Sequence, residues 1–398
     1  MNRRELLTGT AVALTAASYS RVLGANDRVR LGVIGLGDRG QHDMGLFQAN
    51  GSVDVVALCD IYDLKTDQAK TKATTAKIYK DHRALLDQKD IDIVQVTTPD
   101  HWHAPIAIDA LNSGRDVYCE KPLTLKIEEG PAIVKAARLN NRVGQVGMQQ
   151  RSGKHYLQAK AEYIDSGRIG KITMARTWWH GNTYHLRKAP DTLKTQPAGL
   201  DWARFVGPLK WRDYDPQQYY NFRAYLDYGG GQVTDLFTHW IDVVHMFTGQ
   251  EIPISAQAAG GVYNYKDGRT APDTINVLLQ YPSEMTATFE ATLAPGATGE
   301  AVEILGTQGR LLIDRSQFTF TPSGRGAQPI QVKAEPGPDP LTQDHVNNFL
   351  DCVKSRKRPN GDVLIGHRSA QASHLGNLSY VQKRRLDFDP VREEILPL

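Results

Sequence analysis

The sequence is poor in cysteine, with Cys59, Cys119 and Cys352 among its 398 residues. The number is odd and no two cysteines form a C-x-x-C pair, so no disulfide framework is predicted. Cys59 and Cys119 end predicted strands, where a free cysteine behaves as a small apolar residue. We therefore expect both to be buried.

Metal-binding motifs are also absent. Twelve histidines include His101-x-His103 and the pair His180 and His185, but the sequence has no H-E-x-x-H and no spaced carboxylate–histidine cluster. The sequence therefore predicts no metal site.

Strong charge of either sign is missing. The formal net charge is +3, and no run of Lys and Arg or basic stripe with interleaved aromatics occurs. Nucleic acid and anionic membrane surfaces are therefore not expected partners. The 40% hydrophobic and 23% charged content is typical of a soluble globular protein, and the length allows two domains.

The first 25 residues have the features of an export signal. Arg3 and Arg4 precede the mildly apolar stretch "LLTGTAVALTAASYS", and "VLGA" offers a small-residue cleavage site near Ala25. The stretch is too short and too weakly apolar for a dependable membrane span. We expect residues 1–25 to be a twin-arginine-type signal and the protein to be periplasmic or otherwise exported, with no membrane partner afterwards. An ordinary frayed N-terminus is the alternative.

Residues 28–150 alternate apolar runs with helical stretches. The expected strands lie in "VRLGVIGLG", "VDVVALCD", "IDIVQVTTP", "DVYCEKP" and "VGQVGMQQR", and the expected helices are 41–49, 64–78, 102–113 and 125–140. Runs rich in β-branched residues, separated by crossover helices, predict a parallel sheet buried on both faces. We predict an α/β Rossmann domain here.

Residues 151–398 have a different pattern. Helices are expected at 155–166, 232–247, 342–355 and 367–383, with a loop-rich, aromatic stretch at 196–228. Strands are expected in "GKITMARTWWH" and in later runs such as "TINVLLQYP", "MTATFEATL" and "QFTFTP". The pattern predicts a second, α+β domain with a mainly antiparallel sheet.

A dinucleotide fingerprint follows the first strand. Gly35-x-Gly37-x-x-Gly40 opens the first helix, and Asp60 ends the next strand 20 residues later. The helix N-terminus would bind the diphosphate, and the carboxylate would accept from the ribose hydroxyls. Asp60 would repel a 2′-phosphate, which favours NAD over NADP, although Arg39 weakens this preference slightly. A glycine-rich turn without a nucleotide is the alternative.

Three stretches carry candidate chemistry. "TTPDHWH", with Pro99 and His103, and "YCEKP", with Lys121, end neighbouring strands, where ligands of open α/β sheets bind. In "GGGQVTDLFTHWID", Asp235 and His239 are four residues apart and share a helix face. The glycines before that helix let the backbone approach another group closely.

Together these motifs give the chain after residue 28 a resemblance to the glucose-fructose oxidoreductase / inositol dehydrogenase / MocA family. The shared motifs are G-x-G-x-x-G, T-P-x-x-x-H, E-K-P, D-x-x-x-H after a glycine run, and the closing "RRLDFDP". The resemblance implies that Lys121, Asp235 and His239 form the catalytic set. It also implies an open antiparallel sheet that packs face to face into homodimers or homotetramers.

The chemistry of these side chains agrees with the resemblance. His239, with a pKa near neutral, could take the proton of a secondary alcohol, and Asp235 would orient it or stabilise its charged form. Lys121 would donate to the substrate oxygen, with Glu120 packed against the turn. Each also has an ordinary alternative: a surface charge, a half-buried histidine, or a helix-supporting acid.

Further residues are expected near the dinucleotide or the substrate. Those expected to contact the dinucleotide are Gly35, Leu36, Gly37, Asp38, Arg39, Gly40, Asp60, Thr98, Pro99, His103, Glu120, Lys121 and Gln149. Two alternatives are open for the end of the last Rossmann strand: contact with the substrate, or a connection between the domains, by Gln149, Gln150 and Arg151. Trp178, Trp179, His180, Tyr184 and His185 form a sugar-facing aromatic loop or an ordinary strand and turn. Arg223 is a candidate hydroxyl or carboxylate anchor.

Three functions are compatible with these features. The first is an exported dehydrogenase that keeps NAD tightly bound and oxidises a sugar, a glycoside or a cyclic polyol. The second is a redox-neutral glycosidase that oxidises a ring carbon transiently, although the lysine of E-K-P favours plain oxidoreduction. The third is a non-catalytic sugar-binding protein, which the intact catalytic set argues against.

Overall fold

The N-terminal domain is built on a six-stranded parallel sheet, in a computed structural model that describes residues 28–397. The strand order is β3-β2-β1-β4-β5-β6. The strands are β1 (Val29–Ile34), β2 (Val53–Cys59), β3 (Lys77–Tyr79), β4 (Ile93–Val96), β5 (Asp116–Cys119) and β6 (Gly144–Val146). The proposed signal segment, residues 1–25, lies outside the described residues.

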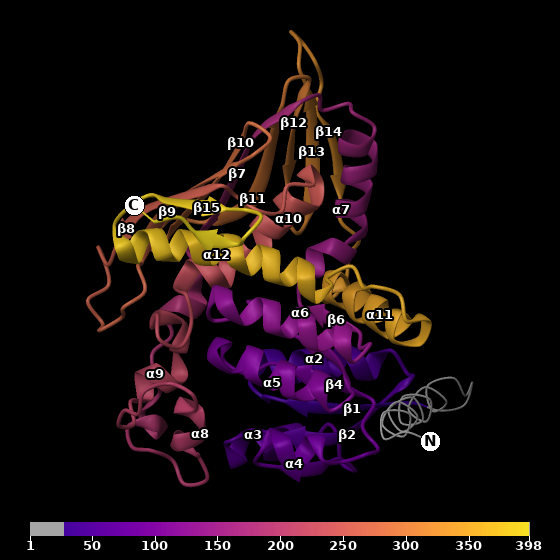
Figure 1. Cartoon of the computed structure of the whole chain (residues 1–398), viewed down its shortest axis with the longest axis vertical. Coiled ribbons are helices and arrows are strands. Elements are labelled where there is room, and N and C mark those ends of the chain that lie inside the picture. Colours follow the sequence, from indigo (N-terminus) through magenta and orange to yellow (C-terminus); the bar gives the residue numbers. More distant parts are fainter. Residues whose placement is uncertain (1–27, 398) are drawn as a thin grey trace, which may run out of the picture.

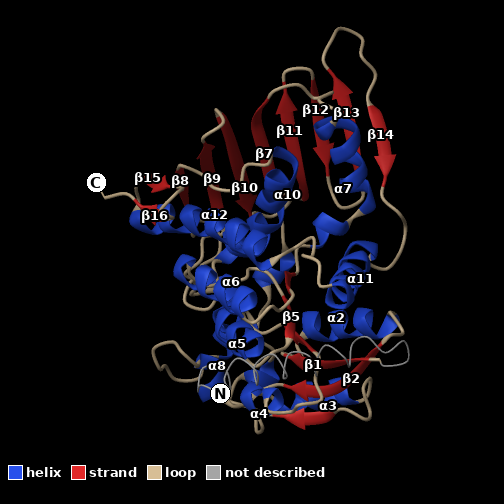
Figure 2. Cartoon of the chain, turned by 45° about the vertical axis from the view of Figure 1, so that its right-hand side comes forward, coloured by secondary structure: helices blue, strands red, loops and turns tan. Residues whose placement is uncertain are grey.

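Helices cover both faces of this sheet (Figures 1 and 2). They are α2 (Asp38–Ala49), α3 (Asp63–Lys70), α4 (His82–Leu86), α5 (Asp100–Asn112) and α6 (Gly130–Leu139). Every residue of β4 and β5 is buried, as the continuous apolar runs predict for a sheet packed on two sides. The Rossmann prediction is confirmed.

A helix from the far end of the chain completes the first domain. α11 (Pro340–Ser355) packs against α2, and its Phe349 ring lies 6.1 Å from Phe47 and 5.8 Å from Tyr118. These rings belong to the cluster of buried side chains that includes β1 and β2. The chain leaves the first sheet after β6, and residues 340–355 return to the first domain.

The second domain contains a ten-stranded sheet of order β14-β13-β12-β11-β7-β10-β9-β8-β15-β16. Its strands are β7 (Ile172–His180), β8 (Ser255–Gly261), β9 (Thr274–Tyr281), β10 (Met285–Thr292), β11 (Gly299–Gly306), β12 (Gly309–Ile313), β13 (Gln317–Pro322), β14 (Ile330–Lys333), β15 (Leu386–Asp389) and β16 (Glu394–Ile395). β7 runs parallel to β10 and the other pairs are antiparallel, which confirms a mainly antiparallel sheet.

One face of this sheet is covered by helices and the other is open (Figure 2). The covering helices are α7 (Lys154–Ala159), the π-helix η3 (Lys160–Asp165), the π-helix η7 (Val233–Phe237), α10 (Thr238–Thr248) and α12 (Val363–Gln382). Along β10, buried and half-buried residues alternate, because every second side chain points into the core. Figure 1 shows α12 lying between the large sheet and α6.

Several predicted elements differ from the structure. The helix expected at 64–78 ends at Lys70, and 77–79 form the edge strand β3 instead. The stretch expected to be loop-rich contains α8 (Trp202–Val206) and α9 (Pro216–Tyr220), which pack through an aromatic cluster of their own. These helices are five residues long, too short to show a helical period in the sequence.

The cysteine prediction is confirmed, since Cys59, Cys119 and Cys352 are buried and free. Among residues 28–397, no helix is both long and apolar enough to cross a membrane.

Candidate active site

A cavity of about 980 Å³ lies between the two domains. The glycine turn, Asp60 and the Pro99 loop line it from the first domain, and Asp235 and His239 line it from the second. The structure thus brings together the dinucleotide fingerprint and the three predicted catalytic residues.

The glycine turn has the form of a phosphate cradle. Gly35 has φ of +90°, and a Cβ at Gly40 would lie 2.0 Å from the Gly35 carbonyl oxygen, so both positions require glycine. At Gly37, which precedes α2, an added Cβ would meet nothing within 4 Å. The open space at a helix N-terminus fits the diphosphate of a dinucleotide.

Asp60 closes the far end of the turn. Its carboxylate accepts from the backbone N–H of Leu36 at 2.7 Å and of Tyr62 at 2.9 Å, and it lines the cavity. Burial raises the pKa of Asp60, which those backbone hydrogen bonds partly oppose. The side chain of Leu36 is buried, so this residue contributes its backbone to the turn.

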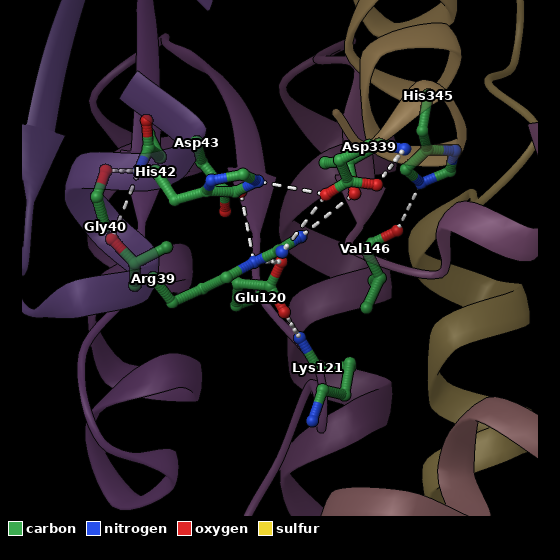
Figure 3. A network of polar contacts seen from close by, with 12 residues as sticks. Arg39, Gly40, His42, Asp43, Glu120, Lys121, Val146, Asp339 and His345 are labelled. Carbon is green, nitrogen blue, oxygen red and sulfur yellow. Dashed lines mark hydrogen bonds and ion pairs between the residues drawn. The ribbon is translucent and has the colours of Figure 1, made fainter. Parts of the chain in front are cut away.

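Arg39 joins the glycine turn to the E-K-P turn (Figure 3). Its Nε lies 3.1 Å from Glu120 Oε1 and 3.0 Å from Asp43 Oδ1, and Asp339 is nearby at 3.8 Å. Burial opposes the charge of Arg39, but the Glu120 and Asp43 carboxylates raise its pKa. Arg39 therefore lines the cavity with its charge balanced by these carboxylates.

Glu120 supports the backbone of the catalytic turn. Its Oε2 accepts from the backbone N–H of Lys121 at 3.1 Å, and a Cβ at Gly147 would lie 2.5 Å from its carboxylate. The peptide bond between Lys121 and Pro122 is cis. Glu120 therefore packs against the turn, as its position in the motif predicts.

Lys121 reaches the helix of the second domain. Its Nζ donates to Asp235 Oδ1 at 2.6 Å and to the Asp235 backbone oxygen at 2.8 Å. The same carboxylate lies 3.3 Å from Arg223 Nε and 2.9 Å from His185 Nε2. Burial alone would raise the pKa of Asp235, but Lys121, Arg223 and His185 hold it well below its usual value.

His239 is positioned by an amide. Its Nδ1 lies 3.2 Å from Gln150 Oε1, so Nδ1 carries the proton and Nε2 is the nitrogen that can accept one. Burial and the Lys121 charge lower the pKa of His239 well below its usual value. The expected pKa near neutral was therefore wrong. Gln150, and not Asp235, accepts the hydrogen bond that orients His239, whereas Asp235 favours the charged form of its ring.

His103 is a positioning residue in this structure. Its ring is buried, with Nδ1 2.6 Å from the Pro122 oxygen and Nε2 2.7 Å from the Thr98 oxygen. Both ring nitrogens are thus engaged by backbone carbonyls of the two loops that line the cavity. His103 also lines the cavity, so its ring links these loops and its contact with the cofactor stays a prediction.

Other predicted residues offer unpaired polar atoms to the cavity. Thr98 Oγ1 and Gln149 Oε1 are buried without a hydrogen-bond partner in residues 28–397, and both residues line the cavity beside Pro99. Asp38 lines it too, and its carboxylate accepts from Arg187 at 3.0 Å. The Thr98 hydroxyl and the Gln149 amide oxygen are suited to the hydroxyl and amide groups of a dinucleotide.

Of the remaining predicted residues, some line the cavity and others only hold the fold together. Trp179 lines the cavity with its ring 6.0 Å from that of His239, and His185 belongs to the Asp235 cluster. Arg151 donates to the Asp242 carboxylate at 2.8 Å and so links the end of the first domain to α10. Within residues 28–397, no group of three or more His, Cys, Asp or Glu is placed to hold a metal ion.

The sequence interpretation missed several charged residues of the cavity, among them Asp100, Arg187 and Arg315. Asp100 lies within the quoted T-P-x-x-x-H segment, which was a signal that could have identified it. No sequence pattern marks Arg187 or Arg315.

Two family models match the chain. One described as "Oxidoreductase family, NAD-binding Rossmann fold" covers residues 29–148, and one described as "GFO/IDH/MocA C-terminal domain" covers residues 208–312. Together they match 225 of the 398 residues.

Among curated proteins, inositol 2-dehydrogenase of Salmonella typhimurium is 35% identical over 173 residues, covering 43% of this chain. The match spans half the length of that relative. The scyllo-inositol 2-dehydrogenase (NAD(+)) of Bacillus subtilis is 24% identical over 83% of this chain and 88% of its own length. An alpha-N-acetylgalactosaminidase of Shewanella oneidensis is 38% identical over 118 residues, 27% of this chain and 26% of that protein.

Among solved structures, a levoglucosan dehydrogenase in complex with NADH and levoglucosan matches with a TM-score of 0.72. The match covers 91% of this chain and 99% of that chain at 19% identity. The fold of both domains is therefore that of a known two-domain architecture.

Proposed function

This chain belongs to the GFO/IDH/MocA family of oxidoreductases, and from its active-site geometry we propose that it is an NAD-dependent dehydrogenase of a sugar, glycoside or cyclic polyol. The observation that carries the proposal is the meeting of Lys121, Asp235 and His239 at a cavity that also holds the glycine turn. The inositol dehydrogenases among its relatives support a polyhydroxylated substrate.

The residues of the first domain suit NAD. Gly37 leaves room for the diphosphate, Asp60 stands where the adenosine ribose binds, and Thr98 and Gln149 offer unpaired oxygens. When bound, the nicotinamide supplies the acceptor for the hydride that leaves the alcohol carbon. A carboxylate at residue 60 and the engagement of Arg39 by Glu120 favour NAD over NADP.

Residues of both domains supply the proton chemistry. The burial that keeps His239 neutral leaves Nε2 ready to take the hydroxyl proton, while Gln150 holds the ring by Nδ1. Lys121 donates to the same oxygen and stabilises its developing negative charge. Asp235 keeps the Lys121 ammonium in place and balances its charge.

The proposal is tested by identifying the bound nucleotide. The purified protein is denatured, the released nucleotide is identified, and intact protein is then mixed with inositol, levoglucosan and a panel of sugars and glycosides. We expect NAD in the released fraction and an increase in nicotinamide absorbance with at least one polyol. Protein that binds no nucleotide, and reduces neither NAD nor NADP with any member of the panel, would contradict the proposal.

A redox-neutral glycosidase is the second candidate, favoured by the galactosaminidase relative, whose match is confined to about a quarter of the chain. Such an enzyme would release the aglycone of an aryl glycoside without added NAD and without net change in the bound cofactor. Lys121, which suits stabilisation of an alkoxide, supports plain oxidoreduction. Aryl α-N-acetylgalactosaminide hydrolysis in the same panel separates the two.

We further propose that the chain is exported folded with its cofactor and assembles through the open face of the large sheet. The twin arginines support export, and the uncovered sheet face supports a homodimer or homotetramer. A reporter fused to residues 1–25 tests export. Light scattering of the purified protein measures the oligomeric state, and a monomer would contradict the assembly.

A further inference from the structure

Asp100 is a buried carboxylate that the catalytic scheme above does not use. It is the first residue of α5, it is 6% exposed, and it lines the cavity. Its side chain makes no hydrogen bond or ion pair with another residue in the part of the chain that the structure describes, 28–397. Burying a polar group without a partner is costly, so an unpaired carboxylate facing a cavity indicates a ligand that supplies the partner.

The surroundings of Asp100 place it at the substrate end of the cavity. The charged groups that act on it are Arg223, Asp235 and Lys121, the cluster that surrounds the reacting oxygen. Burial raises the pKa of Asp100 to about 7, an effect that Asp235 reinforces and Arg223 and Lys121 oppose. This carboxylate therefore belongs with the catalytic cluster and not with the glycine turn.

A glycine of the second domain makes room for it. A Cβ at Gly229 would lie 3.0 Å from Asp100 Oδ2, tighter than most side chains tolerate. Gly229 begins the glycine run before η7, whose close approach to some group was expected from the sequence. At Gly229 that group is Asp100, whereas an added Cβ at Gly230 or Gly231 would meet Thr234 or Ala271. Gly229 preserves the space in which the Asp100 carboxylate stands.

We propose that Asp100 is a specificity-determining residue whose carboxylate accepts a hydrogen bond from a second hydroxyl of the substrate, beside the hydroxyl held by Lys121 and His239. The inference rests on the proposed function, because it assigns the recognition of a diol to the same cavity. A carboxylate that accepts from a hydroxyl suits sugars and cyclic polyols, in which most carbons next to a secondary alcohol carry a second hydroxyl.

Asp100 accepts best when ionised, which sets the direction of the pH dependence. The value of kcat/KM for a polyol should rise with pH up to about 7 and level off above it. His239 does not produce this inflection, because its pKa lies well below that range. His101 and His103 on the same helix direct their rings to backbone carbonyls.

The test compares Asp100→Asn with Gly229→Ala and with the control Asp215→Asn. Asp215 caps α9 outside the cavity, and asparagine also caps helices. The probes are inositol, levoglucosan and analogues of each that lack one hydroxyl. Polyol oxidation is followed by nicotinamide absorbance, polyol binding by calorimetry, and bound nucleotide by release and quantification.

We expect Asp100→Asn to lower kcat/KM by about 10- to 100-fold, mainly through KM, and to remove the inflection near pH 7. Gly229→Ala should reproduce part of this loss, because its methyl group displaces the carboxylate. For the analogue that lacks the hydroxyl bound by Asp100, kcat/KM of the wild type should fall by a similar factor. For Asp100→Asn, kcat/KM with this analogue should be no lower than with the complete polyol. The control and the nucleotide content should be unchanged.

Different failures have different meanings. If the wild type oxidises a polyol and Asp100→Asn keeps its KM and pH profile, the role of Asp100 is overturned and the proposed function stands. If Asp100→Asn loses nucleotide instead, its carboxylate serves the cofactor and the inference is again wrong. If the wild type neither binds nor oxidises any polyol, the inference and the proposed function fall together.

Discussion

At residue 121, a positive charge is held between two domains by one carboxylate. Asp235 binds Lys121 at 2.6 Å and also contacts Arg223 and His185. Lys121, Arg223 and His185 therefore converge on one carboxylate, which holds the lysine in place. Such a preorganised donor is most effective where negative charge develops during the reaction.

Replacing Lys121 with methionine should therefore lower kcat by about 10²- to 10³-fold. Methionine keeps the apolar stem, and Arg223 and His185 still accompany Asp235, so folding and bound nucleotide should be retained. Steady-state oxidation of the best polyol and nucleotide quantification measure the effect. Lys154→Ala, which removes an exposed lysine paired with Glu335, should leave both readings unchanged.

The raised pKa of Asp100 also has a consequence for stability. A carboxyl whose pKa is higher in the folded than in the unfolded protein loses stability as pH rises from about 4 to about 7. Asp100→Asn should therefore match the wild type near pH 4 and exceed its free energy of unfolding by about 2–4 kcal/mol above pH 7. Urea unfolding at several pH values measures this difference, and equal stabilities at pH 8 would show that Asp100 ionises at no cost.

At the scale of elements, the segment 181–193 crosses from the second domain to the mouth of the nucleotide cavity. Asn182, Tyr184 and Arg187 line the cavity, and Arg187 binds Asp38 of the glycine turn at 3.0 Å. The segment is also held by α9, because the Gln217 side chain donates to the Arg187 carbonyl at 2.7 Å. We expect a segment held in this way to slow the departure of a bound dinucleotide.

Arg187→Ala should release the nucleotide faster, by about fivefold, which corresponds to about 1 kcal/mol for a partly exposed ion pair. Catalysis at saturating NAD should change little, because Arg187 takes no part in the proton transfer. Stopped-flow displacement of bound nucleotide gives the rate. Lys188→Ala removes a positive charge from the neighbouring exposed position. A similar acceleration of nucleotide release in this variant would show that the effect is not specific to Arg187.

At the scale of the molecule, the two domains are interlocked because the chain returns to the first after building the second. α11 lies at residues 340–355 yet packs on α2, the helix that begins at the glycine turn. Near its start, Asp339 contacts His42 of α2 at 2.9 Å (Figure 3). The nucleotide site therefore depends on a helix that lies about 300 residues later in the sequence.

Phe349→Ala should reveal this dependence. The ring is fully buried between Phe47 and Tyr118, so its removal should cost about 3–5 kcal/mol of unfolding free energy and weaken nucleotide binding through α2. Urea unfolding and nucleotide titration measure the two effects. Leu139→Ala, at a side chain 74% exposed, should change stability by less than about 0.5 kcal/mol.

The sequence by itself determined the features that local chain geometry controls. Gly35 and Gly40 specify a turn through backbone sterics, and buried β-branched runs specify parallel strands. The spacing of Asp235 and His239 places them on one helical segment. These patterns depend on neighbours within a few residues, so the Rossmann domain, the mainly antiparallel sheet and the location of the cavity could be predicted.

Only the tertiary structure decided which side chains meet across the domains. The pairing of Gln150 with His239, the unpaired Asp100 beside Gly229, and the return of α11 join residues 89 to about 300 positions apart. No periodicity records such contacts, because they depend on how the two sheets and the helices between them pack. For the same reason, the pKa of His239 followed from burial beside Lys121, which its own helix does not reveal.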